Sequence, residues 1–264
     1  MYSDFNIHIN SSGIFDEDLN LSLLNLDTEF SRLSNELNAA NISCGNLMIL
    51  DQDLLGKEKE RNQLIHHSRE LNLDLTLLVN QKNKDYVNTL RTAKDIGIKT
   101  IKFHPYFQHI LGDQHKDAVK IAQAASDMDF NIAVCCSYGT KYVHYINGRR
   151  LLADLVIAGI KTPIIALHSG GKDVLDIMSI ALDCNNVYLE TSYSIPCWIG
   201  SSVEADIAFA FKKVGAHRCL YGSDRPYMPL DRNITDTLNF LSKHQFNDNE
   251  IDNIMSITYK SLFE

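Results

Sequence analysis

Short runs of apolar residues recur along the chain at intervals that favour an alternation of strands and helices. Eight such runs have the length of buried strands, at residues 3–8, 45–50, 74–79, 98–104, 131–136, 163–168, 187–191 and 218–222. The segments between them are longer and carry apolar residues at three- and four-residue spacing, as in residues 16–40 and 201–215. That spacing is typical of helices that bury one face.

Two of the helical segments carry residues that commonly begin and end helices. The segment 201–215 has a serine at both of its first positions, Ser201 and Ser202, and ends at Gly215. Near the end of the chain, Glu250 follows Asn247 by three residues, which predicts a capping box at the start of a last helix. Both patterns support helices between and after the predicted strands.

Eight strand–helix units in succession imply parallel strands joined by crossover helices. The chain has 264 residues, and a closed (β/α)8 barrel typically needs about 250. No glycine-rich dinucleotide-binding fingerprint follows the first strand, which disfavours an open doubly wound sheet. No linker or charge run marks a second domain. We therefore predict an α/β protein with a single parallel eight-stranded TIM barrel over residues 1–264.

Composition and charge narrow the class of protein. The net charge of -8 argues against nucleic acid or an anionic membrane as a partner. No apolar stretch approaches the roughly 18 residues of a membrane span, and the first residues do not resemble a signal peptide. The six cysteines form no CxxC pair, which indicates free thiols in a reducing compartment. We expect a soluble, cytoplasmic protein that acts on a small molecule, with assembly into a homo-oligomer left open.

Polar residues gather where the predicted strands end, which is where barrel enzymes build their active sites. Those residues are Asn6, His8, Lys102, His104, Cys135, Cys136, His168, Glu190, Thr191 and Asp224. Three histidines and an aspartate from distant parts of the chain suit metal binding or proton transfer, so we predict a common site. The remaining histidines lie in helices or loops and are expected to be ordinary, namely His66, His67, His109, His115, His144, His217 and His244.

The loops give weaker signals, each with two interpretations. The sequence "HSGG" from His168 fits an anion-binding turn and a plain tight turn equally well. Arg225 could bind a substrate carboxylate or form an ordinary salt bridge. Tyr193 and Trp198 could line a pocket or pack in the core. Lys102 could offer its charge to the barrel mouth or form an internal ion pair.

These strand-end motifs resemble the amidohydrolase superfamily, and within it the amidohydrolase-2 branch that includes aminocarboxymuconate-semialdehyde decarboxylase. "DFNIHI" is similar to the strand-1 motif Asp-x-His-x-His, and "GIKTIKFHP" to the strand-4 pattern Gly-x-x-x-x-Lys-x-His-Pro. "ALHSGG" and "NVYLETS" resemble the region of strands 6 and 7, and "LYGSDRP" resembles the Gly-Ser/Thr-Asp-x-Pro motif of strand 8. The resemblance extends nearly end to end and implies a barrel with hydrolase or decarboxylase chemistry.

The resemblance also implies a divalent metal, usually zinc, and this sequence departs from the expected ligands. The family holds its metal with two strand-1 histidines, a strand-5 histidine and the strand-8 aspartate. His8 and Asp224 match, and His168 matches the strand-6 histidine that polarises the substrate or moves a proton. Asn6 replaces the first strand-1 histidine, and Cys135 replaces the strand-5 histidine.

The replaced ligands leave two alternatives open. A zinc ion could bind His8, Cys135 and Asp224, with Asn6 as a weak extra ligand, because zinc accepts nitrogen, sulfur and oxygen. A register shifted by one residue would put Cys136 there in place of Cys135. Without a metal, Asp224 must act alone on water, and its pKa would have to rise above the ordinary value of about 3.9. Metal-free lactonases in the same branch make this second route consistent with the resemblance.

We predict a hydrolase that attacks a small amide, ester or lactone with water. Asp224 is the predicted general base, His168 and Lys102 offset charge on the oxyanion, and His104 supports them. The residues predicted to contact the substrate are Arg225, Trp198, Tyr193 and Asn6. The alternatives are decarboxylation of a small unsaturated acid and an inactive barrel that binds a small ligand.

Overall fold

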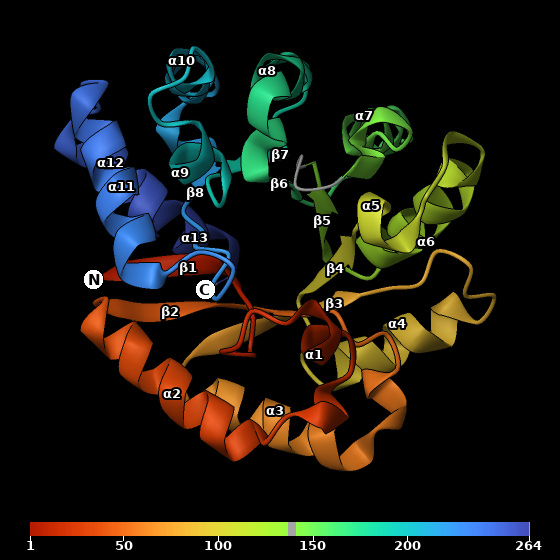
Figure 1. The fold of residues 1–264 in the computed structure, drawn as a ribbon. Helices are drawn as coiled ribbons and strands as arrows, with labels where there is room; N and C mark the ends of the chain where they lie inside the picture. Colours follow the sequence, from red (N-terminus) through yellow and green to blue (C-terminus); the bar gives the residue numbers. More distant parts are fainter. Residues whose placement is uncertain (137–140, 264) are drawn as a thin grey trace.

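The computed structural model describes residues 1–136 and 141–263, which form a barrel of parallel strands ringed by helices (Figure 1). The eight strands of the described chain lie side by side in sequence order, and every neighbouring pair is parallel. Their bounds are Tyr2–Ile7 (β1), Ile42–Ile49 (β2), Leu73–Leu78 (β3), Thr100–Phe103 (β4), Asn131–Cys135 (β5), Ile164–Leu167 (β6), Val187–Glu190 (β7) and Cys219–Leu220 (β8). Each overlaps a predicted run, although β2 begins three residues before its run, and the predicted (β/α)8 barrel is confirmed.

The helices follow the strands in alternation and cover the outside of the barrel. Their bounds are Phe15–Leu19 (α1), Leu26–Ala39 (α2), Glu58–Glu70 (α3), Tyr86–Asp95 (α4), Pro105–Gln108 (α5), His115–Asp127 (α6), Gly148–Ile157 (α7), Val174–Asp183 (α8), Ser194–Trp198 (α9), Val203–Val214 (α10), Leu230–Lys243 (α11), Asp248–Asp252 (α12) and Thr258–Phe263 (α13). In the described part of the chain, none of them combines the length and hydropathy that crossing a membrane requires.

Hydrogen bonds between the first and last strands close the barrel. The Asp224 amide donates to the Asn6 carbonyl at 2.8 Å, and the His8 amide donates to the Arg225 carbonyl at 2.8 Å. A bridge between Ile7 and Arg225 continues this contact. Closure therefore brings strand-end residues from opposite ends of the sequence together at one rim.

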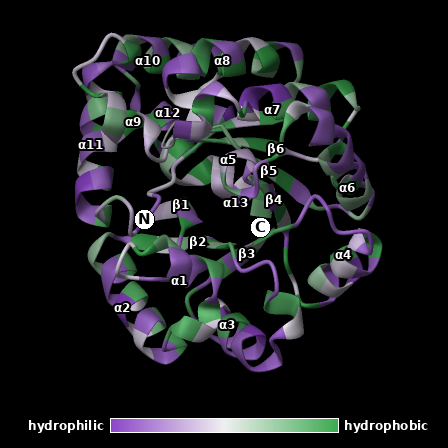
Figure 2. Ribbon diagram, turned by 45° about the vertical axis from the view of Figure 1, so that its right-hand side comes forward, coloured by the Kyte–Doolittle hydropathy of each residue, from purple (hydrophilic) through white to green (hydrophobic). Residues whose placement is uncertain are grey.

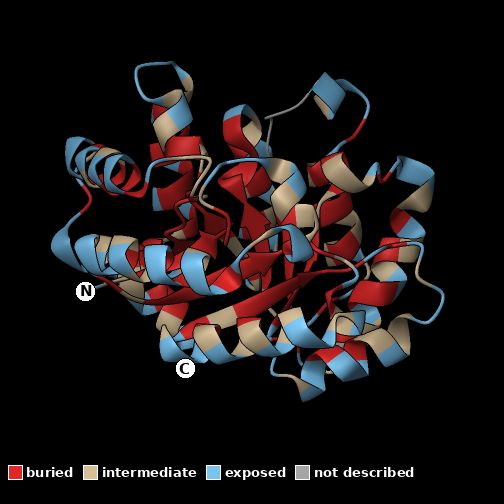
Figure 3. Cartoon of the chain, turned by 60° about the horizontal axis from the view of Figure 1, so that its bottom comes forward, coloured by how far each residue is buried: buried red, intermediate tan, exposed pale blue. Residues whose placement is uncertain are grey.

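Strand side chains alternate between the barrel interior and the layer beneath the helices. In β2, Leu47 and Ile49 belong to the large cluster that packs on the helices, whereas Met48 belongs to a smaller cluster with residues such as Phe5. Hydrophobic residues follow the strands and the inner faces of the helices (Figure 2). The central strands are correspondingly buried, and the outer helix faces are exposed (Figure 3).

The last helix, α13, packs at the end of the barrel where the strands begin. The rings of Tyr259 and Phe263 lie 6.5 and 5.6 Å from that of Phe5, centre to centre. The Tyr259 hydroxyl donates to an Asp74 carboxylate oxygen at 2.7 Å. Because this end is filled, the opposite end, where the strands finish, is the one available for a site.

Helix-capping residues set the local boundaries. The segment 16–40 is divided rather than continuous, because the Asn25 side chain accepts from the Thr28 amide and starts α2 as a separate helix. Helix α10 begins at Val203, whose amide donates to the Ser201 hydroxyl, and it ends at Gly215 with φ 96°. The predicted capping box at the start of α12 is confirmed.

Candidate active site

A cavity of about 230 Å³ lies at the carboxyl ends of the strands, and we call it the mouth. It is lined by His8, Phe15, Leu50, Lys102, His104, His168, Tyr193, Asp224 and Tyr227. The structure thus brings together the four residues predicted to be catalytic, the predicted ligand His8 and the predicted substrate contact Tyr193. Their convergence from strands 1, 4, 6 and 8 follows from the closed barrel.

His8 lies between two carboxylates in the mouth. Its Nδ1 is 3.3 Å from Asp18 Oδ2, and its Nε2 is 3.5 Å from Asp224 Oδ1. Burial alone would lower the pKa of His8, but the Asp18 and Asp224 charges outweigh burial and raise it. The Tyr227 hydroxyl donates to Asp18, which fixes that carboxylate. His8 is therefore held in one orientation and favours its protonated form.

The Asp224 carboxylate is protonated only in strong acid. Burial would raise its pKa, but the contact with His8 and the charges of His168 and Lys102 lower it to about 2. The condition stated for a metal-free route, a raised pKa of Asp224, is therefore not met. The cause is the surrounding positive charge, which stabilises the ionised form more than burial penalises it.

His168 is held by the end of β7. Its amide donates to Glu190 Oε2 at 3.0 Å, and its Nδ1 lies 3.0 Å from the Ser192 carbonyl oxygen. Burial would lower the pKa of His168, but a hydrogen bond with the Cys135 thiol and the charges of Asp224 and Glu190 raise it to about 9. At neutral pH the ring is an imidazolium that donates hydrogen bonds.

Of the vicinal cysteines, Cys135 is buried beneath the mouth beside His104 and His168, and Cys136 packs in the large hydrophobic cluster. Burial would raise the pKa of the Cys135 thiol, but the nearby His104 and His168 rings lower it well below its ordinary value. Burial raises the pKa of Cys136 instead. The structure therefore selects the register in which Cys135 occupies the strand-5 position.

Asn6, which stands at the other altered position, lies buried beneath the mouth. Its side-chain amide donates to the Ser192 hydroxyl at 2.8 Å. That hydroxyl donates in turn to Glu190 Oε2 at 2.8 Å. Asn6 therefore supports the loop that holds His168 and is not among the residues that line the cavity.

The donors at the mouth do not fit a zinc ion. Among the described residues, the ligand atoms of His8, Cys135 and Asp224 do not come within 4.8 Å of one another as a group. Burial lowers the pKa of Lys102, and the nearby Cys135 and Asp224 partly oppose this effect. His104 lies beside Cys135, and Lys102 lies near Cys135 and Asp224, so two basic side chains adjoin the groups that would hold a metal.

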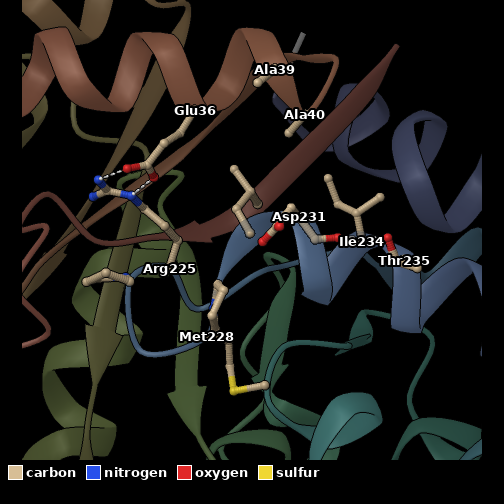
Figure 4. A pocket seen from close by; sticks show the side chains of 11 residues that line it. Glu36, Ala39, Ala40, Arg225, Met228, Asp231, Ile234 and Thr235 are labelled. Carbon is tan, nitrogen blue, oxygen red and sulfur yellow. Dashed lines mark hydrogen bonds and ion pairs between the residues drawn. The ribbon is translucent and has the colours of Figure 1, made fainter.

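Arg225 does not reach the mouth, contrary to one of the two expectations for it. Its Nε and Nη2 donate to the Glu36 carboxylate at 2.6 and 3.0 Å (Figure 4). Its Nη1 donates to the carbonyls of His8, Ile9 and Asn10 at 2.8 to 3.1 Å. The side chain lines a separate cavity of about 590 Å³ between α2 and α11, outside the barrel. All three of its nitrogens donate to structural partners, so the ordinary salt bridge is the correct interpretation.

Trp198 and the "HSGG" turn are also structural. Trp198 ends α9 and packs on the hydrophobic core rather than lining the mouth. Ser169 and Gly170 are buried with φ of 47° and 81°, and a Cβ on Gly170 would lie 2.7 Å from Ile177. The turn is thus closely packed, which supports the tight-turn interpretation over an anion-binding one.

Several residues of the mouth were not predicted from the sequence. Phe15 and Asp18 come from α1 in the first loop, which lies inside the ring of helices (Figure 1). Leu50 follows β2, and Tyr227 follows the strand-8 motif. The acidic "FDED" in the loop after strand 1 is the one signal that could have indicated Asp18, because loop residues there face the strand ends.

Comparison with known families gives one match. The sequence profile of the family described as Amidohydrolase matches residues 76–255. No curated protein sequence matches the chain.

Solved structures share the fold over essentially the whole chain. A probable 2-pyrone-4,6-dicarboxylic acid hydrolase from Acinetobacter baumannii, with citric acid bound, is 16% identical, covers 99% of this chain and 98% of that one, and has a TM-score of 0.70. An amidohydrolase from Burkholderia multivorans with bound zinc is 11% identical over 100% and 99%, with a TM-score of 0.71. A 2,6-dihydroxybenzoate decarboxylase from Rhizobium is 12% identical over 99% and 98%, with a TM-score of 0.66. At these identities the likeness shows the barrel fold.

Proposed function

Because the chain belongs to the Amidohydrolase family, we propose that it is an enzyme that hydrolyses a small anionic ester or lactone in the mouth without a metal. The family is typically metal-dependent. This chain departs from that dependence, because the residues at the mouth do not fit a zinc ion. One observation carries the proposal: His8 and Asp224 lie with Lys102 and His168 in one cavity, and Asp18 lies 3.3 Å from His8 Nδ1.

The geometry assigns a role to each group in the hydrolysis. A water beside His8 and Asp224 attacks the substrate carbonyl and passes its proton to the Asp224 carboxylate. The new carbon–oxygen bond leaves negative charge on the carbonyl oxygen, which Lys102 and His168 offset. The tetrahedral intermediate then collapses, the old carbon–oxygen bond breaks, and His168 gives a proton to the leaving oxygen.

The pKa values of these groups restrict the substrate. With a pKa of about 2, Asp224 is a weak base, so the carbonyl must be activated by a good leaving group. His168, with a pKa of about 9, matches an enol or phenol leaving oxygen better than an alkoxide. This favours lactones and enol esters over amides.

Charge and size restrict the substrate further. Lys102 and three histidines face a cavity of about 230 Å³, which suits a small molecule that carries one or more carboxylates. The hydrolase named among the similar structures acts, by its name, on a pyrone dicarboxylic acid. We therefore take such a lactone as the first substrate to test. A small-molecule substrate, a cytoplasmic location and any homo-oligomer stay predictions.

Decarboxylation is the second candidate, and His8 is the observation that favours it. Its raised pKa makes it a proton donor toward the mouth, where a proton must replace the departing CO₂. One of the similar structures is named as a decarboxylase.

The experiment that tests the proposal is an activity screen of chelator-treated protein. Pyrone dicarboxylates, other lactones, enol esters, dihydroxybenzoates and simple amides are incubated with it, and products are identified by mass spectrometry. A lactone product heavier than its substrate by one water, or the acid and enol fragments of an ester, supports the hydrolase. Release of CO₂ without addition of water would assign the second candidate, and turnover of amides alone would contradict both.

Replacing Lys102 with methionine is expected to lower kcat/KM by about a hundredfold, because the variant keeps the volume and loses the charge opposite the oxyanion. The matched control is Lys99→Met, since Lys99 pairs with Asp74 at the closed end of the barrel. Steady-state kinetics on the first lactone substrate provide the measurement. Equal rates for both variants would show that the Lys102 charge plays no part.

The activity is expected to stay level from mildly acidic pH to about pH 9 and to fall about tenfold per unit above it. The fall follows because His168 loses its proton there, while Asp224 stays ionised down to about pH 2. His168→Gln should be slower and lose this upper limb. The raised pKa of His168 also contributes to the stability of the fold. This contribution is complete below pH 6.5 and is lost as the pH rises through about 9. A flat profile beyond pH 10 would contradict the role of His168.

A further inference from the structure

A cluster on the last turn of α3 carries ligands that no part of the proposed reaction uses. We propose that His66, His67 and Glu70 bind one transition-metal ion of the zinc type. Helix α3 ends at Glu70 and leads into the start of β3, so this turn lies at the opposite end of the barrel from the mouth. The two histidines were expected from the sequence to be ordinary surface residues.

The helix places one carboxylate between two imidazoles. Glu70 follows His66 by four residues and His67 by three, and both spacings bring side chains together on a helix. His66 Nε2 lies 3.4 Å from Glu70 Oε1, and His67 Nδ1 lies 3.2 Å from Glu70 Oε2. All three residues offer ligand atoms within 4.8 Å of one another. In a tetrahedral zinc site with bonds of about 2.0 Å, ligand atoms are about 3.3 Å apart, so the two histidine–carboxylate separations are in the range that such a site needs.

A carboxylate from the neighbouring helix supports this arrangement. Asp27, in the first turn of α2, lies with its Oδ1 2.8 Å from His67 Nε2. A histidine that donates from one ring nitrogen to a carboxylate presents the lone pair of the other, and this carboxylate–histidine pairing is common in zinc sites. The Phe30 ring stacks on His67 at 4.9 Å and fixes its plane. His67 Nδ1 is therefore aimed toward Glu70 as a ligand atom.

The surroundings of His67 suit a metal ligand. When Nε2 carries the ring hydrogen and donates to Asp27, Nδ1 presents its lone pair on the side of Glu70, where one metal ion would bind both. His66 contributes the third ligand, and its 68% exposed side chain leaves the fourth position open to water.

The test titrates the untagged, chelator-treated full chain with zinc by calorimetry and with cobalt by visible absorption. We expect one ion per chain, with binding weakened at least tenfold in His66→Ala, His67→Ala and Glu70→Gln. Asp27→Asn removes no ligand and should weaken binding by about tenfold. Zinc should also raise the melting temperature of the unmodified chain and not that of His66→Ala. The matched control is His217→Ala, an exposed histidine in another part of the chain.

Three results would overturn the proposal. The first is no saturable binding up to about 1 mM zinc. The second is unchanged binding in both His66→Ala and Glu70→Gln, which would place the ion elsewhere. The third is binding lost in Asp224→Ala and kept in His66→Ala, which would move the ion to the mouth. Circular dichroism of each variant verifies that the helix is intact.

Discussion

Replacing Asp224 with asparagine is expected to lower kcat/KM by at least about a thousandfold. The amide keeps the size of the side chain, but it cannot accept the proton of the attacking water. It also removes the negative charge 3.5 Å from His8 Nε2, so the pKa of His8 should fall in the variant. Steady-state kinetics measure the first effect, and NMR titration of the His8 ring measures the second.

The control for this variant is Asp231→Asn. Asp231 is an acidic residue in the first turn of α11 that lines the cavity outside the barrel (Figure 4). It should leave kcat/KM within about twofold. A loss of less than tenfold in Asp224→Asn would show that Asp224 is not the base, even if the fold and the mouth are as described.

Replacing Arg225 with methionine is expected to lower the free energy of unfolding by about 3–5 kcal/mol. The variant keeps much of the buried volume but leaves the Glu36 carboxylate without its two donors. It also leaves the carbonyls of His8, Ile9 and Asn10 without the Nη1 donor. Urea denaturation of the full chain measures the change.

Arg232→Met is the matched control, because the Arg232 side chain is 71% exposed and, among the described residues, pairs only with Asp236 four residues along α11. It should change stability by less than about 1 kcal/mol. Should Arg225→Met instead keep its stability and raise KM, the residue would be a substrate contact, and the structural assignment would be wrong.

The fold could be predicted from the sequence because its signal is local. Each strand is a short apolar run, and capping residues such as Asn247 and Glu250 act within one turn of the helix that they begin. The strand-end residues of the site could be predicted too, since the closed barrel gathers the carboxyl ends of its strands whatever lies between them.

The electrostatics of the site could not be predicted, because they depend on contacts between distant residues. The partner of Arg225 is Glu36, 189 positions away, and nothing near either residue indicates the pairing. The low pKa of Asp224 likewise depends on His168 and Lys102, which come from other strands. A sequence shows which groups carry charge, but their mutual effect requires their positions.

The loop residues of the site could not be predicted for a related reason. Asp18 and Tyr227 lie on different loops and meet only over His8. Neither belongs to a strand-end motif, and the helical pattern of residues 16–40 concealed the short α1 that carries Asp18.

The central claim is that this member of the Amidohydrolase family catalyses hydrolysis at the mouth without a metal. Its most direct test is the hydrolysis rate of the first lactone substrate before and after exhaustive chelation, with metal content measured by plasma mass spectrometry. The His66→Ala variant is used, so that an ion on α3 does not enter the count. The account predicts an unchanged rate with less than about 0.05 metal ions per chain. A rate lost on chelation and restored by zinc would contradict it and return His8, Cys135 and Asp224 to the role of metal ligands.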